Sequence, residues 1–293
     1  MLSPDSAPTP YILGVVLVAL LAFMVVRAVR KDRREYGRFK RMRATGRRQK
    51  VMRKWVRESF ITFGGSAVVV LVLVWQFVPL LLDAVNRWGF VADARRTFAD
   101  SGALGVGLVA GLAVALVGGT ILIVVLARKE TEVASVGDVQ ALLPRNRAEL
   151  PYGAALAINA GVVEELLFRL AMPALIFGVT GSAVAAVVAS IMVFALLHVY
   201  QGVAGIVGAL VIGILLMAVY LATGSILAAI VVHALFDLRS LVLIPVVVFG
   251  VHKELGNGKS AAAAKRSQAA PVLDPLLGST TAPADDSLPA DRP

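Results

Sequence analysis

The feature that most constrains this chain is residues 170–236, a run of 67 residues without a single Asp, Glu, Lys or Arg. A helix needs only about 20 apolar residues to cross a bilayer, so this run is long enough for several crossings. Residues 59–82 and 101–127 are also free of charge. Stretches such as LVALLAFMVV show none of the alternation that is typical of a membrane β-barrel. The sequence therefore predicts an all-α, polytopic bundle of membrane helices.

Seven apolar spans are expected along the chain. They lie at about residues 11–29, 59–82, 102–127, 151–177, 182–199 and 203–222, and from Ser225 onward. The short connections between the later spans predict antiparallel neighbours. The apolar patch 240–251 is too short for an ordinary crossing, so it is either a short eighth helix or a continuation of the seventh. We therefore predict seven to eight transmembrane helices and leave the side of the C-terminus open.

Positive charge is concentrated in residues 27–57, which hold fifteen Lys or Arg and two acidic residues, a net +13. Such a block can indicate nucleic-acid binding. Between two apolar spans it is more typical of a cytoplasmic loop that follows the positive-inside rule, so no nucleic-acid partner is expected. We expect the loop to rest on anionic headgroups of the bilayer, with Phe39, Trp55 and Val56 at the interface.

Six chemically active residues lie inside or at the ends of the apolar spans: Glu164, Glu165, Arg169, His198, His233 and Asp237. A charged side chain at a helix centre costs about 2.5–3.5 kcal/mol on insertion scales, so these groups must face one another or a wet cavity. The i, i+4 spacing of Glu165 and Arg169 favours an ion pair, whereas Glu164 points about 100° away. We predict one structural and one reactive glutamate.

Two further pairs have the same spacing, Phe194 with His198 and His233 with Asp237. An aspartate at this distance can orient an imidazole and select its tautomer. Buried Glu and His residues also occur in proton-coupled transporters. Two histidines and a carboxylate, here Glu164, could bind zinc, but the HEXXH arrangement is absent, and we predict neither a metal nor another cofactor.

The motifs EELLFR, FALLH and HALFD resemble, in order, the three motifs of the CPBP family of CAAX-protease and bacteriocin-processing membrane peptidases. The resemblance covers about residues 140–245 and implies an intramembrane glutamate-type endopeptidase. By this resemblance Glu164 is the general base that activates water with His198, and His233 and Asp237 stabilise the oxyanion. Three residues support the site: Glu165, Arg169 and Phe194. Prenyl endopeptidases typically have Asn in place of Asp237, which can donate only when protonated, so Asp237 can instead orient His233.

Three regions are expected: residues 1–135 with three spans and the basic loop, residues 136–252 as the CPBP-type catalytic bundle, and residues 253–293 as a disordered tail rich in Pro, Ala, Ser and Asp. The predicted function is hydrolysis of a peptide bond in a membrane-associated protein or peptide. The alternative is a non-proteolytic binding, immunity or accessory protein that uses the same cavity. Ala- and Arg-rich usage indicates a bacterium, and the spans indicate a multi-pass protein of its plasma membrane, so a prenylated substrate is not carried over.

Overall fold

The computed structural model describes residues 3–102, 107, 111 and 140–254. Within these residues every regular element is helical and no strand occurs, as the sequence predicts. The described residues belong to one compact unit. Most of the third expected span and of the expected tail lie outside the described residues, so the number of spans and the disorder of the tail remain predictions.

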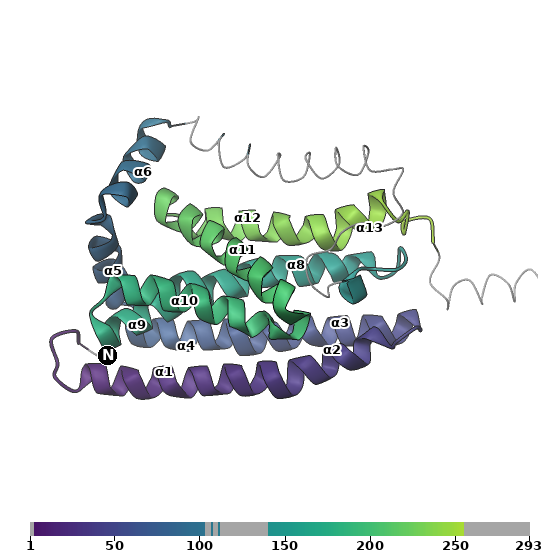
Figure 1. Cartoon of the computed structure of the whole chain (residues 1–293), viewed down its shortest axis with the longest axis horizontal. Coiled ribbons are helices and arrows are strands. Elements are labelled where there is room, and N and C mark those ends of the chain that lie inside the picture. The colour runs from purple at the N-terminus through teal and green to yellow at the C-terminus, as the bar shows by residue number, and fades with distance from the viewer. Residues whose placement is uncertain (1–2, 103–106, 108–110, 112–139, 255–293) are drawn as a thin grey trace, which may run out of the picture. The chain divides into compact units, whose positions relative to one another are not determined.

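Two long helical rods make up the N-terminal part (Figure 1). The first rod comprises α1 (Thr9–Val26), the π-helical turn η1 (Arg27–Asp32) and α2 (Arg33–Lys40). The second comprises α3 (Thr45–Ser59), the π-helical turn η2 (Phe60–Gly64) and α4 (Gly65–Val74). The basic segment 27–57, expected as a loop, is therefore helical apart from a short turn at 41–44. Phe39, expected at the headgroups, is fully buried beneath the guanidinium group of Arg48.

The second rod ends at Val74, earlier than the span expected over 59–82. Pro79 has no N–H with which to continue the helical hydrogen bonds, and its ring crowds the carbonyl group of Trp75, four residues back. The chain turns there and resumes as α5 (Phe77–Asn86), followed by α6 (Gly89–Asp100). α5 packs against α9 and α6 against α11.

The C-terminal part is a second set of helices. They are η3 (Gln140–Leu142), α8 (Leu150–Glu165), the π-helical turn η4 (Leu166–Ala171), α9 (Met172–Thr180), α10 (Ala183–Leu197), the 3₁₀ turn η5 (His198–Gln201), α11 (Gly202–Thr223), α12 (Ile226–Leu238), the π-helical turn η6 (Arg239–Leu243) and α13 (Ile244–Val247). η5 folds α11 back along α10 (Figure 1). The helix that begins at Ile226 continues past Arg239 to Val247, which favours the second reading of the patch 240–251.

α9 and α11 both end at a threonine, and the same two residues, Gly-Ser, separate α9 from α10 and α11 from α12. Gly181 and Gly224 end their helices with φ of 66° and 65°, a left-handed conformation that glycine adopts without steric cost. Ser182 and Ser225 then accept hydrogen bonds from the backbone N–H three residues later, as N-cap residues do. These short turns make neighbouring helices antiparallel.

Apolar side chains cover the outside of the apolar stretches of the long helices, whereas the charges of the motifs lie inside. Val15 on α1, Val69 on α4 and Val211 on α11 are 71%, 62% and 60% exposed, whereas Glu165 and Arg169 are buried. A bilayer requires this arrangement. Four helices among the described residues are long and apolar enough to cross a membrane: Thr9–Lys40, Thr45–Val74, Ala183–Thr223 and Ile226–Val247. The segment from α8 to α9, which carries Glu164, Glu165 and Arg169, is not one of these four.

Candidate active site

The close approach of α8 and α12 brings two of the predicted motifs together. A Cβ atom on Gly161 would lie 2.9 Å from both the Cβ atom and the backbone nitrogen of Ala234. Only glycine therefore fits at this contact. Glu165 lies about one helical turn beyond Gly161, and His233 directly precedes Ala234. The contact between α8 and α12 consequently places the side chains of Glu165 and His233 facing each other.

Glu165 is the hub of the buried polar groups. Its Oε1 accepts a 2.7 Å hydrogen bond from Nδ1 of His233, and its Oε2 lies 3.1 Å from Nε of Arg169. The ion pair expected from the i, i+4 spacing is therefore present, and the bond to His233 is an additional one. The three side chains are 0–5% exposed. Each oxygen of Glu165 thus has a partner in a place that water does not reach.

Phe194 lies between the three motifs. Its ring centroid is 4.7 Å from the guanidinium carbon of Arg169, 4.9 Å from the ring of His198 and 6.2 Å from the ring of His233. A cation over an aromatic face is attracted by the negative electron density of that face. Gly213 of α11 packs on the ring, because a Cβ atom there would lie 3.1 Å from Cδ1 of Phe194. Phe194 therefore contacts Arg169 and both imidazoles.

His198 sits where α10 ends, and its tautomer follows from one contact. Its Nδ1 lies 2.8 Å from the backbone oxygen of Phe194. A carbonyl oxygen can only accept, so Nδ1 carries the proton and donates it. In the neutral ring this leaves the lone pair of Nε2 available. The half-buried His198 can therefore take up a proton at Nε2.

Glu164 and Asp237 are less tightly held than Glu165. Glu164 is half-buried, and among the described residues it forms no hydrogen bond or ion pair. Oδ2 of Asp237 lies 3.7 Å from Nε2 of His233, which is too far for a hydrogen bond. Of the two adjacent glutamates, one is engaged at both oxygens and the other is not.

Two tyrosines that the motifs did not single out continue this cluster toward the N-terminal rods. The ring of Tyr200 stacks on His198 with centroids 6.0 Å apart. Tyr36 of α2 meets Tyr200 edge-on at 5.4 Å and is 3% exposed. Local spacing carries no signal for this contact, because it joins segments that are far apart in the chain.

The zinc alternative required Glu164, His198 and His233 to converge as ligands. Within the described ranges, no three His, Cys, Asp or Glu side chains are grouped as a metal site requires. The buried groups are instead paired with one another, Glu165 with Arg169 and with His233.

A family model described as type II CAAX prenyl endopeptidase Rce1-like matches residues 146–239. These residues, less than half of the chain, are similar to the Rce1-like family. The match begins just before α8 and ends just after α12, and it includes all seven residues that the motifs single out. The family assignment made from the three motifs is thus confirmed. No curated protein and no solved structure matches the chain.

The match to the Rce1-like model supports a membrane endopeptidase of the CAAX type, which is a hydrolase. The two N-terminal rods lie outside the Rce1-like segment. They nevertheless contact it, since η1 and α2 lie against η5 and α4 against η4. The surroundings of the Rce1-like site are therefore built partly by residues that the family does not describe.

Proposed function

We propose that the protein is an intramembrane endopeptidase that hydrolyses a peptide bond with a water molecule activated by Glu164 and His198. The observation that carries this proposal is the unequal engagement of the two adjacent glutamates. Glu165 is held by Arg169 and His233, whereas Glu164 has no partner among the described residues. A carboxylate without a fixed partner can bind water and remove its proton.

The proposed reaction begins when Glu164 accepts a proton from a water molecule that also bonds to Nε2 of His198. The hydroxide adds to the carbonyl carbon of the substrate and forms a tetrahedral intermediate. As this intermediate collapses, the C–N bond breaks and Glu164 gives its proton to the leaving amine. A positioned general base contributes roughly 10²–10⁴-fold to such a reaction.

We assign His233 to the oxyanion. Its Nδ1–H is committed to Glu165, so it can donate to a substrate only from a protonated Nε2. The carboxylates of Glu165 and Asp237 lie on the two sides of this ring, and nearby negative charge favours the imidazolium form. The 3.7 Å separation from Asp237 leaves Nε2–H available to the substrate. In this scheme Asp237 supplies charge, and Arg169 and Phe194 hold Glu165 and the two imidazoles in place.

The proposed substrate is a membrane-associated protein or peptide, and the proposed location is the plasma membrane of a bacterium. A site enclosed by membrane helices is reached most readily by a chain that already lies in or on the bilayer. Whether that chain is prenylated is a separate question, to be decided by comparing lipidated and unlipidated peptides of the same sequence.

The test is cleavage of a peptide library by the purified full-length chain in lipid nanodiscs, with products identified by mass spectrometry. Glu164→Gln keeps the shape of the side chain but cannot accept the proton of water, so turnover should disappear while the thermal midpoint is unchanged. Asp93→Asn is the matched control, because it removes a carboxylate that is 75% exposed. A Glu164→Gln chain that cleaves at the original rate would remove the glutamate mechanism. A chain that binds peptides in this assay but cleaves none would favour the non-proteolytic alternative.

A further inference from the structure

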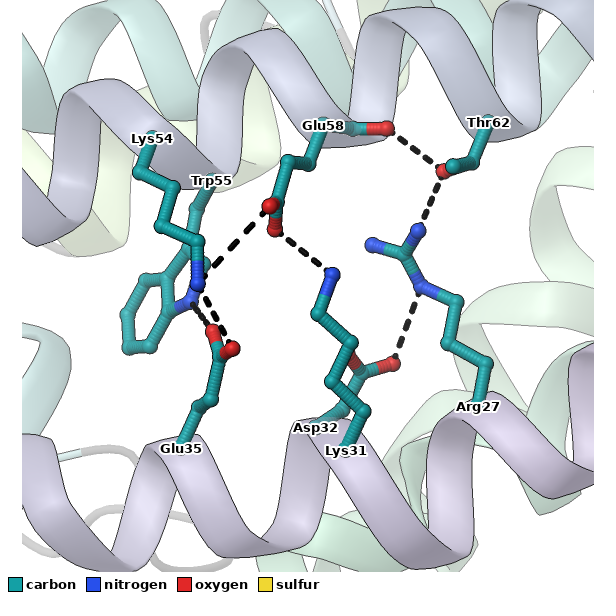
Figure 2. A network of polar contacts seen from close by, with 8 residues as sticks. All are labelled: Arg27, Lys31, Asp32, Glu35, Lys54, Trp55, Glu58 and Thr62. Atoms are coloured by element: carbon teal, nitrogen blue, oxygen red, sulfur yellow. Dashed lines mark hydrogen bonds and ion pairs between the residues drawn. The ribbon is translucent and has the colours of Figure 1, made fainter.

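The acidic residues of the two N-terminal rods face inward, between the rods. Only two acidic residues, Asp32 and Glu35, occur in segment 27–57, and Glu58 follows it directly. Figure 2 shows all three in one network between the two rods. Asp32 pairs with Arg27, Glu35 with Lys54, and Glu58 with both Lys31 and Lys54. The charged side chains that are exposed on this part of the rods are consequently all cations.

The network also fixes which residues lie at the same level. Three side-chain contacts join the rods: Arg27 with Thr62, Lys31 with Glu58, and Glu35 with Lys54. From one contact to the next, the residue number rises by four on the first rod and falls by four on the second, because the rods are antiparallel. For each residue of the first rod, the contacts therefore give the residue of the second rod that lies at the same height along the pair. Position 30, for example, is level with position 59.

The exposed surface changes from apolar to cationic at one common level. On the first rod, Val29 is 49% exposed, and the next residue, Arg30, begins the exposed cations. On the second rod, Phe60 and Ile61 are 63% and 62% exposed, and Arg57 is the nearest exposed cation. Since the cross-links place these transitions side by side, the boundary belongs to the pair of rods and not to one helix. A boundary of this kind marks the edge of the hydrocarbon core of a bilayer.

We propose that the four exposed arginines next to this boundary form a collar that binds the phosphate groups of anionic phospholipids. The collar consists of Arg30, Arg33, Arg34 and Arg57, which are all exposed. With a rise of about 1.5 Å per residue, they lie within about 6 Å beyond the boundary, the depth of a headgroup layer. Arg30 and Arg34 also line one hollow, together with Lys31, Arg38 and the carboxylate of Glu35, so that cations outnumber the single acid there by four to one.

The turn between the rods carries a second group of exposed cations, the tip, which has a different role. The tip consists of Arg41, Arg43, Arg47 and Lys50, which are likewise exposed. By the same rise they lie about 13 Å or more beyond the boundary. The screening length at physiological salt is about 8 Å. The tip therefore starts about 7 Å outside the headgroup layer, close to one screening length, and should contribute less to the selection of lipids than the collar, although it carries as many charges.

This inference is independent of the proposed peptidase activity, and the chain supplies its own matched control. Two variants of the full-length chain each replace four cations by glutamine, one in the collar and one in the tip. A third variant replaces the four collar arginines by lysine. Each protein is reconstituted in phosphatidylcholine bilayers that contain trace spin-labelled phosphatidylglycerol or spin-labelled phosphatidylcholine. Electron spin resonance then gives the ratio of the association constants of the two lipids.

The unaltered chain should prefer phosphatidylglycerol, and the collar variant should lose about twofold or more of this preference. The tip variant and the lysine collar should keep it, because both retain the charge at headgroup level. An equal loss in the tip and collar variants would overturn the proposal, as would a collar variant that keeps the preference. The proposal also fails if the unaltered chain shows no lipid preference but binds a single-stranded oligonucleotide in detergent at physiological salt. In that case the exposed cations bind nucleic acid.

Discussion

His233 donates a 2.7 Å hydrogen bond from Nδ1 to the carboxylate of Glu165, which lies 68 residues earlier in the chain. The bond joins α12 to α8 and explains how an imidazole can be oriented without its i, i+4 aspartate. It also means that Glu165 serves two cationic or donating groups, since Arg169 lies 3.1 Å away on the other oxygen. The following predictions start from this buried trio and proceed outward.

Removal of Arg169 should destabilise the fold more than removal of both members of its pair. Arg169→Ala leaves the charge of Glu165 with only His233, and breaking a buried pair costs about 3–5 kcal/mol. The double variant Glu165→Gln with Arg169→Met removes both charges, keeps an oxygen that accepts from His233, and should recover part of the loss. Thermal unfolding of both variants in nanodiscs measures this. A double variant that is no more stable than Arg169→Ala would contradict the pairing.

Gly161→Ala should disturb the site although no functional atom is changed. The added methyl group would lie 2.9 Å from Ala234, so α8 and α12 must separate, at a cost of about 1–3 kcal/mol. The bond between Glu165 and His233 would lengthen, and turnover should fall. Gly65→Ala is the control, because a Cβ atom there meets nothing within 4 Å. Equal behaviour of the two variants in thermal unfolding and in peptide cleavage would refute the prediction.

Tyr36 should affect turnover as a positioning residue, through Tyr200 and His198. Tyr36→Leu removes the ring that meets Tyr200 at 5.4 Å, whereas Tyr36→Phe keeps that ring. We expect the leucine variant to lose kcat without a matching change in KM, and the phenylalanine variant to retain both values. Steady-state kinetics on a cleaved library peptide distinguish these outcomes. Unchanged kcat in the leucine variant would show that the contact has no bearing on His198.

Arg48 should be the one cation of the basic segment whose loss unfolds the N-terminal rods. It is fully buried, lies 3.0 Å from Glu149 and donates to the carbonyl oxygens of Ala141 and Leu143. Arg48→Met strands the carboxylate of Glu149 and should cost about 3–5 kcal/mol. Arg47→Met, at the exposed neighbouring position, should cost less than about 0.5 kcal/mol. The thermal unfolding midpoints of the two variants test this prediction, and equal midpoints would contradict it.

Asp237→Asn should have only a modest effect on turnover. Its carboxylate is 3.7 Å from Nε2 of His233, so the substitution breaks no hydrogen bond to that ring and removes only a nearby charge. The loss should stay far below the roughly 10²–10⁴-fold expected for a proton-transfer residue. Glu164→Gln, assayed in parallel, provides that reference. A loss of similar size in the two variants would assign Asp237 a direct role in the reaction.

Features that depend on residues close in the chain could be predicted from the sequence. The i, i+4 pairing of Glu165 and Arg169 and the contact of Phe194 with His198 follow from helical geometry alone. The helical class follows from the long apolar runs. The early end of the second span at Val74 could also have been predicted, because Pro79 marks it.

Features that join distant segments could not be predicted in this way. The bond between Glu165 and His233 depends on how closely α8 approaches α12, which is set by the pairing of Gly161 with Ala234. The helical state of residues 27–57 was missed because a dense block of like charge is typical of a loop. Acids on each rod are cross-linked there to cations on the other, and a charge total does not reveal such partners.

The buried pair of Arg48 and Glu149 limits how residues 146–239, the Rce1-like segment, can be transferred to another protein. Glu149 lies inside the Rce1-like residues 146–239, but its counter-charge comes from a rod outside them. A graft that carried only those residues into another protein would bring an uncompensated buried carboxylate directly before α8, at its N-cap position. Transplantation should therefore succeed only when α3 travels with the graft, and the two segments form one structural unit in spite of their separation in the chain.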